Sequence, residues 1–285
     1  MSHSFATYDE GIKERYGGGV SYGGKTAAIL KIPTQIITIG TDDIEPGINE
    51  LQKLGLQIQR VKREKSNNFS NDYRNGERKI FARSYINSPL SLSDFYEKIV
   101  CDGVIFFPGL HEISLESILS FDAKVIFLDI AGFTRKLGEL ENGLYPITHG
   151  HWESMSLFRN KIDVLKVSHE DMEGIEGNSE VEKAQNLAEN GFPIVLFTRG
   201  EKSTILARKG KPILEIPVEK TNGDIAGAGE VFSVGFMFEY LLTNDVIKAV
   251  FFGNICAWYK IRGEEYDYKK AKKKAEEVFL KAKQQ

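Results

Sequence analysis

The 285-residue sequence predicts an α/β fold built on a mostly parallel sheet. Short apolar runs, typical of buried strands, alternate with segments of helical periodicity along most of the chain. This alternation implies right-handed crossover connections, which place neighbouring strands parallel to one another. The composition agrees, because 41% hydrophobic and 27% charged residues are usual for a globular protein.

The expected strands of this sheet are apolar runs bounded by polar or turn-forming residues. They are Gln35–Ile39, Val104–Phe107, Lys124–Asp129, Asp163–Val167 and Pro193–Thr198. A first helix is expected to start near Ser21. A second has Pro46 in its first turn, where proline is well tolerated, and stops at Gly55.

Three more helices are expected in the second half of the chain. Ser179 can cap a helix that stops at Gly191. Residues Val231–Leu242 are apolar on almost every side and predict a buried helix. Residues 271–282 carry one apolar stripe, and their many lysines are expected to form a solvated face.

Two segments depart from this pattern, residues 5–16 and about 57–86. Both are polar and charged, with short stretches of alternating apolar residues. We expect them to form short antiparallel strands outside the α/β core. Because no internal repeat or low-complexity linker is evident, we expect one domain over residues 1–285 with a β appendage.

The net charge and the cysteine content indicate which binding partners and which cellular compartment to expect. The formal net charge of −3 gives no electrostatic footprint for nucleic acid. No apolar run is long enough to cross a membrane, and the first residues lack a signal-peptide pattern. Cys101 and Cys256 lie in apolar surroundings, so we expect free thiols and a cytoplasmic protein.

A glycine-rich segment matches a phosphate-binding pattern. Residues 19–26 fit the phosphate-loop motif Gly-x4-Gly-Lys-Thr, with Lys25 as its lysine. Such a loop must follow a buried strand, and the preceding residues 10–16 are too polar to form one. We therefore interpret the match as accidental. A phosphate-loop NTPase remains a weaker alternative function.

A second glycine-rich segment, Asp224–Glu230, directly precedes the expected buried helix. Its small residues let the backbone approach a ligand closely, and the free N–H groups at a helix start bind anions. Glu230 falls in the first turn, where its carboxylate could accept a proton from a nucleophile. An ordinary tight loop with an acidic first-turn residue is the other interpretation.

Asp224–Glu230 resembles the Asp-Thr-x-Gly-Ala-Gly-Asp motif of the ribokinase-like (PfkB) carbohydrate kinases. Three further segments resemble the family in the same order along the chain. Gly17-Gly18 match its early glycine pair, and Thr198–Lys202 is similar to its Thr-x-Gly-x-x turn beside the nucleotide. Asp129–Arg135 resembles the Asp-x-Gln-Gly-Phe-x-Arg segment of one branch, which also has tyrosine where Tyr22 stands and includes inositol-kinase-like members.

The resemblance implies a three-layer α/β/α sandwich with a small β lid formed by residues 5–16 and 57–86. It implies transfer of the γ-phosphoryl group of ATP, with Mg²⁺, to a hydroxyl of a sugar, polyol or nucleoside, and a homodimer through the lid. It implies a catalytic base at Glu230 and anion-binding N–H groups at Gly227, Ala228 and Gly229.

The resemblance also assigns the binding residues. The nucleotide is expected to bind Asp224, Thr198, Gly200, Asn254 and Ser168, and magnesium to bind Asp171 and Asp224, mostly through water. The acceptor is expected to bind Asp9, Gly17, Gly18, Tyr22 and Arg135.

The sequence also departs from the family pattern. Glu230 stands where the family has Asp, Ser168–Asp171 where it has Asn-x-x-Glu, and Ser203 where glycine is common. Only three residues precede Ser4–Asp9, too few for the family's first strand, so we expect either a true start upstream of Met1 or a sheet that has lost this strand. A non-catalytic descendant that binds a sugar or nucleotide is therefore the alternative function. His149-Gly150-His151 lacks a third nearby ligand and does not predict a metal site.

Overall fold

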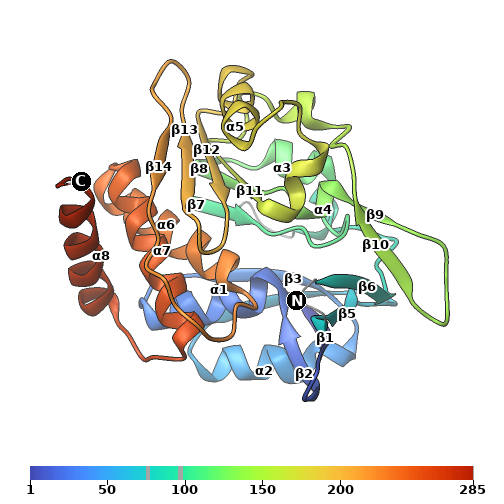
Figure 1. The fold of residues 1–285 in the computed structure, drawn as a ribbon. Helices are drawn as coiled ribbons and strands as arrows, with labels where there is room; N and C mark the ends of the chain where they lie inside the picture. Colours follow the sequence, from blue (N-terminus) through green and yellow to red (C-terminus); the bar gives the residue numbers. More distant parts are fainter. Residues whose placement is uncertain (75–77, 96–98, 285) are drawn as a thin grey trace.

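The protein is described here by a computed structural model that covers residues 1–74, 78–95 and 99–284 (Figure 1). Strands dominate the first half of the chain, and three long helices complete it. The elements in chain order are β1 (Ser2–Tyr8), β2 (Gly11–Gly17), α1 (Gly18–Ile29), β3 (Gln35–Gly40), α2 (Glu45–Lys53), β4 (Gln57–Lys62), β5 (Asn68–Asp72), β6 (Lys79–Ser84), β7 (Cys101–Phe106), α3 (Leu115–Ser120), β8 (Ala123–Asp129), α4 (Ala131–Thr134), β9 (Arg135–Leu137), β10 (Tyr145–His149), β11 (Val164–Ser168), α5 (Glu180–Glu189), β12 (Ile194–Thr198), β13 (Thr204–Ala207), β14 (Leu214–Ile216), α6 (Ala228–Thr243), α7 (Val246–Arg262) and α8 (Tyr268–Ala282).

The main sheet has six strands in the order β14-β13-β12-β11-β8-β7. Neighbours from β7 to β12 are parallel, and β13 and β14 are antiparallel. Alternate side chains enter two cores. Phe127 and Leu196 pack with α6, α7 and α8, whereas Leu128 and Val195 pack with α5 on the opposite face (Figure 1). The three-layer sandwich of ribokinase type is therefore confirmed.

A second six-stranded sheet, the lid sheet, has the order β2-β1-β5-β6-β10-β9. It contains the expected segment 5–16 and, from the second expected segment, β5 and β6; residues 75–77 lie outside the described residues. Strands β9 and β10 complete this sheet and were not expected. The pairing is mixed, because β1 and β5 are parallel.

The beginning of the second expected lid segment forms a different structure. Residues 57–62 are β4, which pairs in parallel with β3 in a separate two-stranded sheet. Leu56 and Ile58 pack into a core with α1 and α2, so their alternation reflects burial against helices and not a position in the lid. Assigning these residues to the lid was wrong.

The chain begins beside this small sheet. The Met1 amino group donates a hydrogen bond to Thr38 Oγ1 on β3 at 2.7 Å. Within the described residues β3 pairs with β4 alone, and the main sheet ends at β7. Ile36 of β3 and Ile105 of β7 nevertheless share one apolar cluster, which joins the two sheets through side chains.

Local sequence signals set the helix boundaries. Ser179 caps α5 by accepting a hydrogen bond from the Glu182 N–H at 3.1 Å. Helix α1 begins at Gly18, three residues before the expected start, and α8 begins after the capping residue Asp267. Helix α7 was not expected. No helix in the described ranges is long and apolar enough to span a membrane.

Candidate active site

A cavity of about 750 Å³ opens between the lid sheet and the carboxyl ends of β8, β11 and β12. The carboxyl ends of parallel strands are where open α/β sheets usually bind ligands. The N-terminal turns of α1 and α6 form another wall. The cavity therefore brings together the glycine-rich segments that lie far apart in the sequence.

The loop before α6 has a conformation that requires glycine. Gly227 has a φ of +79°, and a Cβ at this position would lie 2.1 Å from Cγ of Tyr22. The Ala228 N–H donates to the Ile225 carbonyl at 3.1 Å and is not free for a ligand. The N–H groups of Gly227 and Gly229 have no hydrogen-bond partner among the described residues. Two of the three expected anion donors are thus available.

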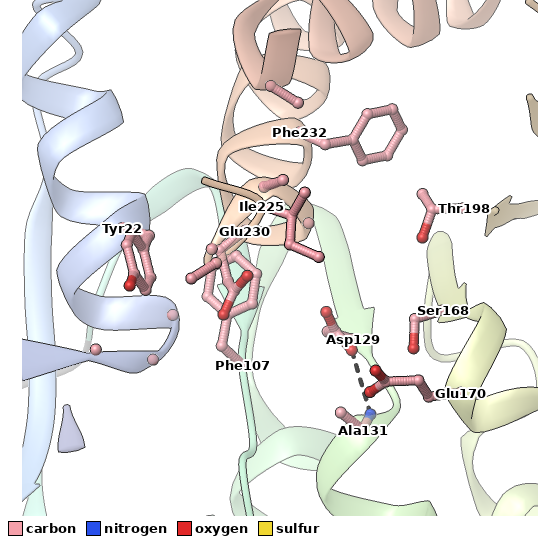
Figure 2. Close-up of a pocket in the computed structure, with 18 of the residues that line it drawn as sticks. Tyr22, Phe107, Asp129, Ala131, Ser168, Glu170, Thr198, Ile225, Glu230 and Phe232 are labelled. Carbon is pink, nitrogen blue, oxygen red and sulfur yellow. Dashed lines mark hydrogen bonds between the residues drawn. The ribbon is translucent and has the colours of Figure 1, made fainter. Parts of the chain in front are cut away.

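Glu230 lies in the first turn of α6 and lines the cavity. Figure 2 shows its side chain on the side of Tyr22 and Phe107, with Asp129 and Glu170 elsewhere on the wall. The carboxylate makes no hydrogen bond or ion pair within the part of the chain that the structure describes. A half-buried carboxylate without a partner is able to accept a proton from a ligand.

The ends of β8 and β11 contribute a buried ion pair to the cavity wall. Lys166 Nζ lies 2.7 Å from Asp129 Oδ2, and the two side chains are 6% and 8% exposed. Asp129 also accepts a hydrogen bond from the Ala131 N–H at 3.2 Å (Figure 2). Burial alone would lower the pKa of Lys166, but Asp129 and Glu230 raise it above its ordinary value. The lysine is therefore charged.

Sequence analysis did not select Lys166 as a site residue. The available signal was a lysine inside the apolar run Val164–Val167, since lysine is rarely buried without a partner. Its partner Asp129 is 37 residues away, on another strand.

Asp171, expected to hold magnesium, is held by hydrogen bonds from other side chains of the protein. It is buried and accepts hydrogen bonds from the hydroxyls of Thr134, at 2.8 Å, and Ser168. Burial would raise the pKa of its carboxyl, but Arg135 and the Ser168 hydroxyl hold it below its usual value. Each carboxylate oxygen thus accepts one hydroxyl hydrogen bond, which fixes the side chain in place. The expected nucleotide ligand Ser168 uses its hydroxyl in the same contact.

The neighbouring Glu170 faces the cavity more openly, and sequence analysis missed it. Its carboxylate forms an ion pair with Arg78 at 3.0 Å. Arg78 directly precedes the lid strand β6 and also lines the cavity. Among the described residues no group of three or more His, Cys, Asp or Glu side chains is arranged to hold a metal ion. Magnesium therefore fits here only as an ion held largely by donor phosphates and water, a usual arrangement for this ion.

Asp224 does not line the cavity. It pairs with Arg15 of β2 at 2.8 Å and lies 3.6 Å from Lys260 of α7. Partial burial would raise the pKa of its carboxyl, but Lys260, the Ala226 N–H and Arg15 lower it below the usual value. Asp224 thus links the loop before α6 to the lid, and its expected part in nucleotide and magnesium binding stays a prediction.

Asp9 is also outside the cavity wall, contrary to the expected acceptor contact. It is exposed in the tight turn between β1 and β2, next to the pair formed by Tyr8 and Gly11. The expected acceptor residues Gly17, Gly18, Tyr22 and Arg135 do line the cavity.

Polar side chains from the lid surround these acceptor residues. Arg135 donates to the Gly109 carbonyl at 2.9 Å, leaving its Nε buried without a partner in the described residues. Polar residues on the lid side of the cavity lining include Ser4, Asn71, Tyr73 and Arg78. Hydroxyl, amide and guanidinium groups of this kind suit a ligand rich in hydroxyls.

The expected donor end of the cavity contains Thr198 and Gly200, as predicted. Asn254 also lies here and accepts a hydrogen bond from the Thr204 hydroxyl at 3.0 Å. Its Nδ2 and the Thr221 hydroxyl are buried and have no partner within the described ranges. Buried polar groups are normally satisfied, so these two atoms are available for contacts with a ligand.

The phosphate-loop match lies elsewhere. Lys25 forms a surface ion pair with Glu50 at 2.8 Å and does not line the cavity. Residues 11–17 do form a strand, β2, but it is largely exposed in the lid sheet. This geometry lacks the buried strand that a phosphate loop follows.

The comparisons with known proteins agree with this arrangement. Residues 148–266 match the family described as pfkB family carbohydrate kinase. A search of curated protein sequences gave no significant match. Solved structures gave many matches over nearly the whole chain.

Three of these structures represent the range. A pyrophosphate-dependent kinase in the ribokinase family, complexed with a pyrophosphate analog and myo-inositol, has a TM-score of 0.79 and 21% identity, covering 96% of this chain and 97% of that one. Ribokinase from Thermotoga maritima has a TM-score of 0.67 and 16% identity, covering 98% and 96%. Arabidopsis thaliana ribokinase, complexed with ribose and ATP, has a TM-score of 0.66 and 14% identity, covering 97% and 95%. The chain thus combines a pfkB carbohydrate kinase sequence signature over residues 148–266 with a ribokinase-like fold, which confirms the resemblance drawn from its motifs.

Proposed function

We propose that the protein is a kinase that transfers the terminal phosphoryl group of ATP to a hydroxyl of a sugar, polyol or nucleoside. The observation that carries this proposal is the position of Glu230. Its unpartnered carboxylate shares one cavity with the free N–H groups of Gly227 and Gly229 and with the hydroxyl-binding side chains of the lid. This arrangement supports a base, an anion site and an acceptor site in one cavity.

The mechanism requires little covalent chemistry from the protein. The acceptor hydroxyl, held between the lid and the start of α1, attacks the terminal phosphorus and gives its proton to Glu230. The Gly227 and Gly229 N–H groups and the positive end of α6 stabilise the charge on the transferred group. Magnesium, when bound, neutralises charge on the donor phosphates, while Asn254 and Thr221 orient the rest of the donor.

Inorganic pyrophosphate is a second candidate donor. Arg15, Arg78, Arg135 and Lys166 are among the cationic residues that line the cavity, and such groups suit a highly charged phosphate donor. A structurally similar protein is described as a pyrophosphate-dependent kinase. The buried, unpaired Asn254 and Thr221 atoms favour ATP, because pyrophosphate has no nucleoside to contact them.

The test is phosphoryl transfer from ATP or pyrophosphate, with Mg²⁺, to a panel of sugars, polyols and nucleosides, followed by ³¹P NMR of the product. We expect a phosphate ester only when an acceptor is present. Binding without turnover would support the non-catalytic descendant. Acceptor-independent hydrolysis that Lys25→Ala abolishes would support the phosphate-loop NTPase.

We also expect the protein to pair with a second copy through the lid sheet.

A further inference from the structure

The Lys166–Asp129 pair has a feature that ion pairing alone does not explain. Parallel pairing of β11 and β8 sets the two residues opposite each other, and their side chains leave the sheet on the face that α6 covers. The pair is almost fully buried, and Asp129 is the one hydrogen-bond partner of the Lys166 ammonium group among the described residues. An ammonium has three N–H donors, so two remain available.

The lysine is directed at the first turn of α6. A Cβ built on Gly229 would lie 3.1 Å from Lys166 Nζ, so the ammonium lies directly against this glycine. The start of a helix carries partial positive charge, and a cation there is unfavourable unless an anion lies between the two. Both Lys166 and Gly229 line the cavity, which leaves room for such an anion.

We propose that Lys166 is a catalytic residue whose ammonium group binds the phosphoryl group during its transfer, and that Asp129 is a positioning residue for it. This inference rests on the proposed function and adds a cationic contact to the two backbone donors. The lysine binds the terminal phosphoryl group, which ATP and pyrophosphate share, so the role is the same with either donor.

The step balances without a change in the protonation of Lys166. A bond forms between the acceptor oxygen and the terminal phosphorus, and the bond from that phosphorus to the bridging oxygen breaks. The bridging oxygen keeps the electron pair and leaves with ADP or phosphate, while Glu230 takes the acceptor proton. Lys166 donates hydrogen bonds to the oxygens of the transferred group throughout.

The experiment compares Lys166→Met, Asp129→Asn, the double variant and Lys25→Met, which removes a surface lysine by the same substitution. Activity with the best acceptor gives kcat and KM. Thermal unfolding with and without inorganic pyrophosphate or ATP gives anion binding independently of turnover, because a ligand that binds the folded state stabilises it.

We expect Lys166→Met to lower kcat by about 10²–10³-fold, the usual effect of removing one transition-state donor, with a small change in the acceptor KM. The double variant should regain stability, since no unpaired charge remains buried, yet stay as inactive as Lys166→Met. Stabilisation by pyrophosphate or ATP should be lost in both and retained in Lys25→Met.

Recovery of kcat in the double variant would show that Lys166 merely neutralises Asp129 and would overturn the inference. So would equal stabilisation of wild type and Lys166→Met by pyrophosphate and ATP, or no stabilisation of the wild type by either. If wild type phosphorylates no acceptor but its stabilisation by pyrophosphate depends on Lys166, the proposed function fails while the anion contact is upheld.

Discussion

At the scale of single residues, Glu230 separates an active kinase from a non-catalytic descendant. The family's aspartate is replaced by a carboxylate one methylene longer, but its pKa in model peptides is nearly the same. The side chain keeps its place at the start of α6 and lines the cavity. A carboxylate is therefore retained at this position, although its reach differs.

Glu230→Gln should lower kcat by about 10²–10⁴-fold, the usual contribution of a general base, while the affinity for ATP changes little. The amide keeps the size of the side chain and the helix start. Glu230→Asp should retain substantial activity. Steady-state kinetics and ATP titration of the three proteins check this. An equally active Glu230→Gln variant would remove Glu230 from the mechanism.

Two separate effects make glycine necessary at position 227, in the loop before α6. Its φ of +79° is costly for other residues, and a Cβ would collide with the ring of Tyr22. Gly227→Ala should therefore lose more stability than a strained backbone alone explains, and should also lose activity. Gly263→Ala is the matched control, because Gly263 has a φ of +66° and no atom within 4 Å of the added Cβ.

Urea unfolding of both glycine variants measures the difference. The control should lose about 1–2 kcal/mol from left-handed strain, with unchanged kcat. Equal losses in the two variants would mean that Tyr22 moves aside without cost and does not constrain the loop.

At the scale of elements, Asp171 joins the end of β11 to α4. Its carboxylate accepts hydrogen bonds from the hydroxyls of Ser168, the last residue of β11, and Thr134, the last residue of α4. Since the folded pKa lies below the ordinary 3.8, the carboxylate contributes stability above that pH. This contribution is lost as the pH falls through the folded value.

Asp171→Asn should lower the free energy of unfolding by about 1–3 kcal/mol at neutral pH, because a buried hydrogen-bonded charge is removed. The difference from wild type should be constant from neutral pH down to about pH 5 and shrink below pH 4. Urea unfolding across this range tests it. Glu153→Gln, at an exposed pair with Lys136, is the control and should change stability by less than about 0.5 kcal/mol. A difference in unfolding free energy that does not change with pH would show that the charge of Asp171 is not the source of its stabilising effect.

Elements were predictable from the sequence where the signal is local and strong. The strands expected at Asp163–Val167 and Pro193–Thr198 are β11 and β12, shifted by one residue, because a buried parallel strand is apolar throughout. The pattern of residues 57–62 also predicted a strand, yet gave no information about its partner. Pairing with β3 depends on packing against α1 and α2, which the strand's own sequence does not encode.

The site was predictable to the extent that glycines and carboxylates form compact motifs. Glu230, Gly227 and Gly229 lie on one short segment and were identified together. Lys166 depends on a partner from another strand, and Glu170 on Arg78 from the lid side, so neither is evident from local sequence. Asp9 and Asp224 were selected from the resemblance to the family, but Asp9 lies in the hairpin turn and Asp224 pairs with Arg15, and neither lines the cavity.

At the scale of the whole molecule, the lid sheet has an open edge that suits the expected homodimer. Strand β2 is the outermost strand, and Ile12 on it is 69% exposed. An unpaired strand edge is a ready template for another chain. Antiparallel pairing about a two-fold axis between Lys13 and Glu14 would set each lysine opposite the partner's glutamate, a favourable cross-strand pair.

Ultracentrifugation of the wild type should therefore show a dimer, and Ile12→Lys should shift it to monomer by placing a charge at the joint. Leu280→Lys adds the same charge at an exposed position on α8 and should leave the mass unchanged. Lys13→Glu should weaken pairing, because glutamates then oppose each other, and adding Glu14→Lys should restore it. A wild type that remains monomeric at high concentration would contradict the prediction, as would a dimer that is indifferent to these charges. Such a dimer would have to use another surface, or pair along β2 in a register that does not set residues 13 and 14 of the two copies opposite each other.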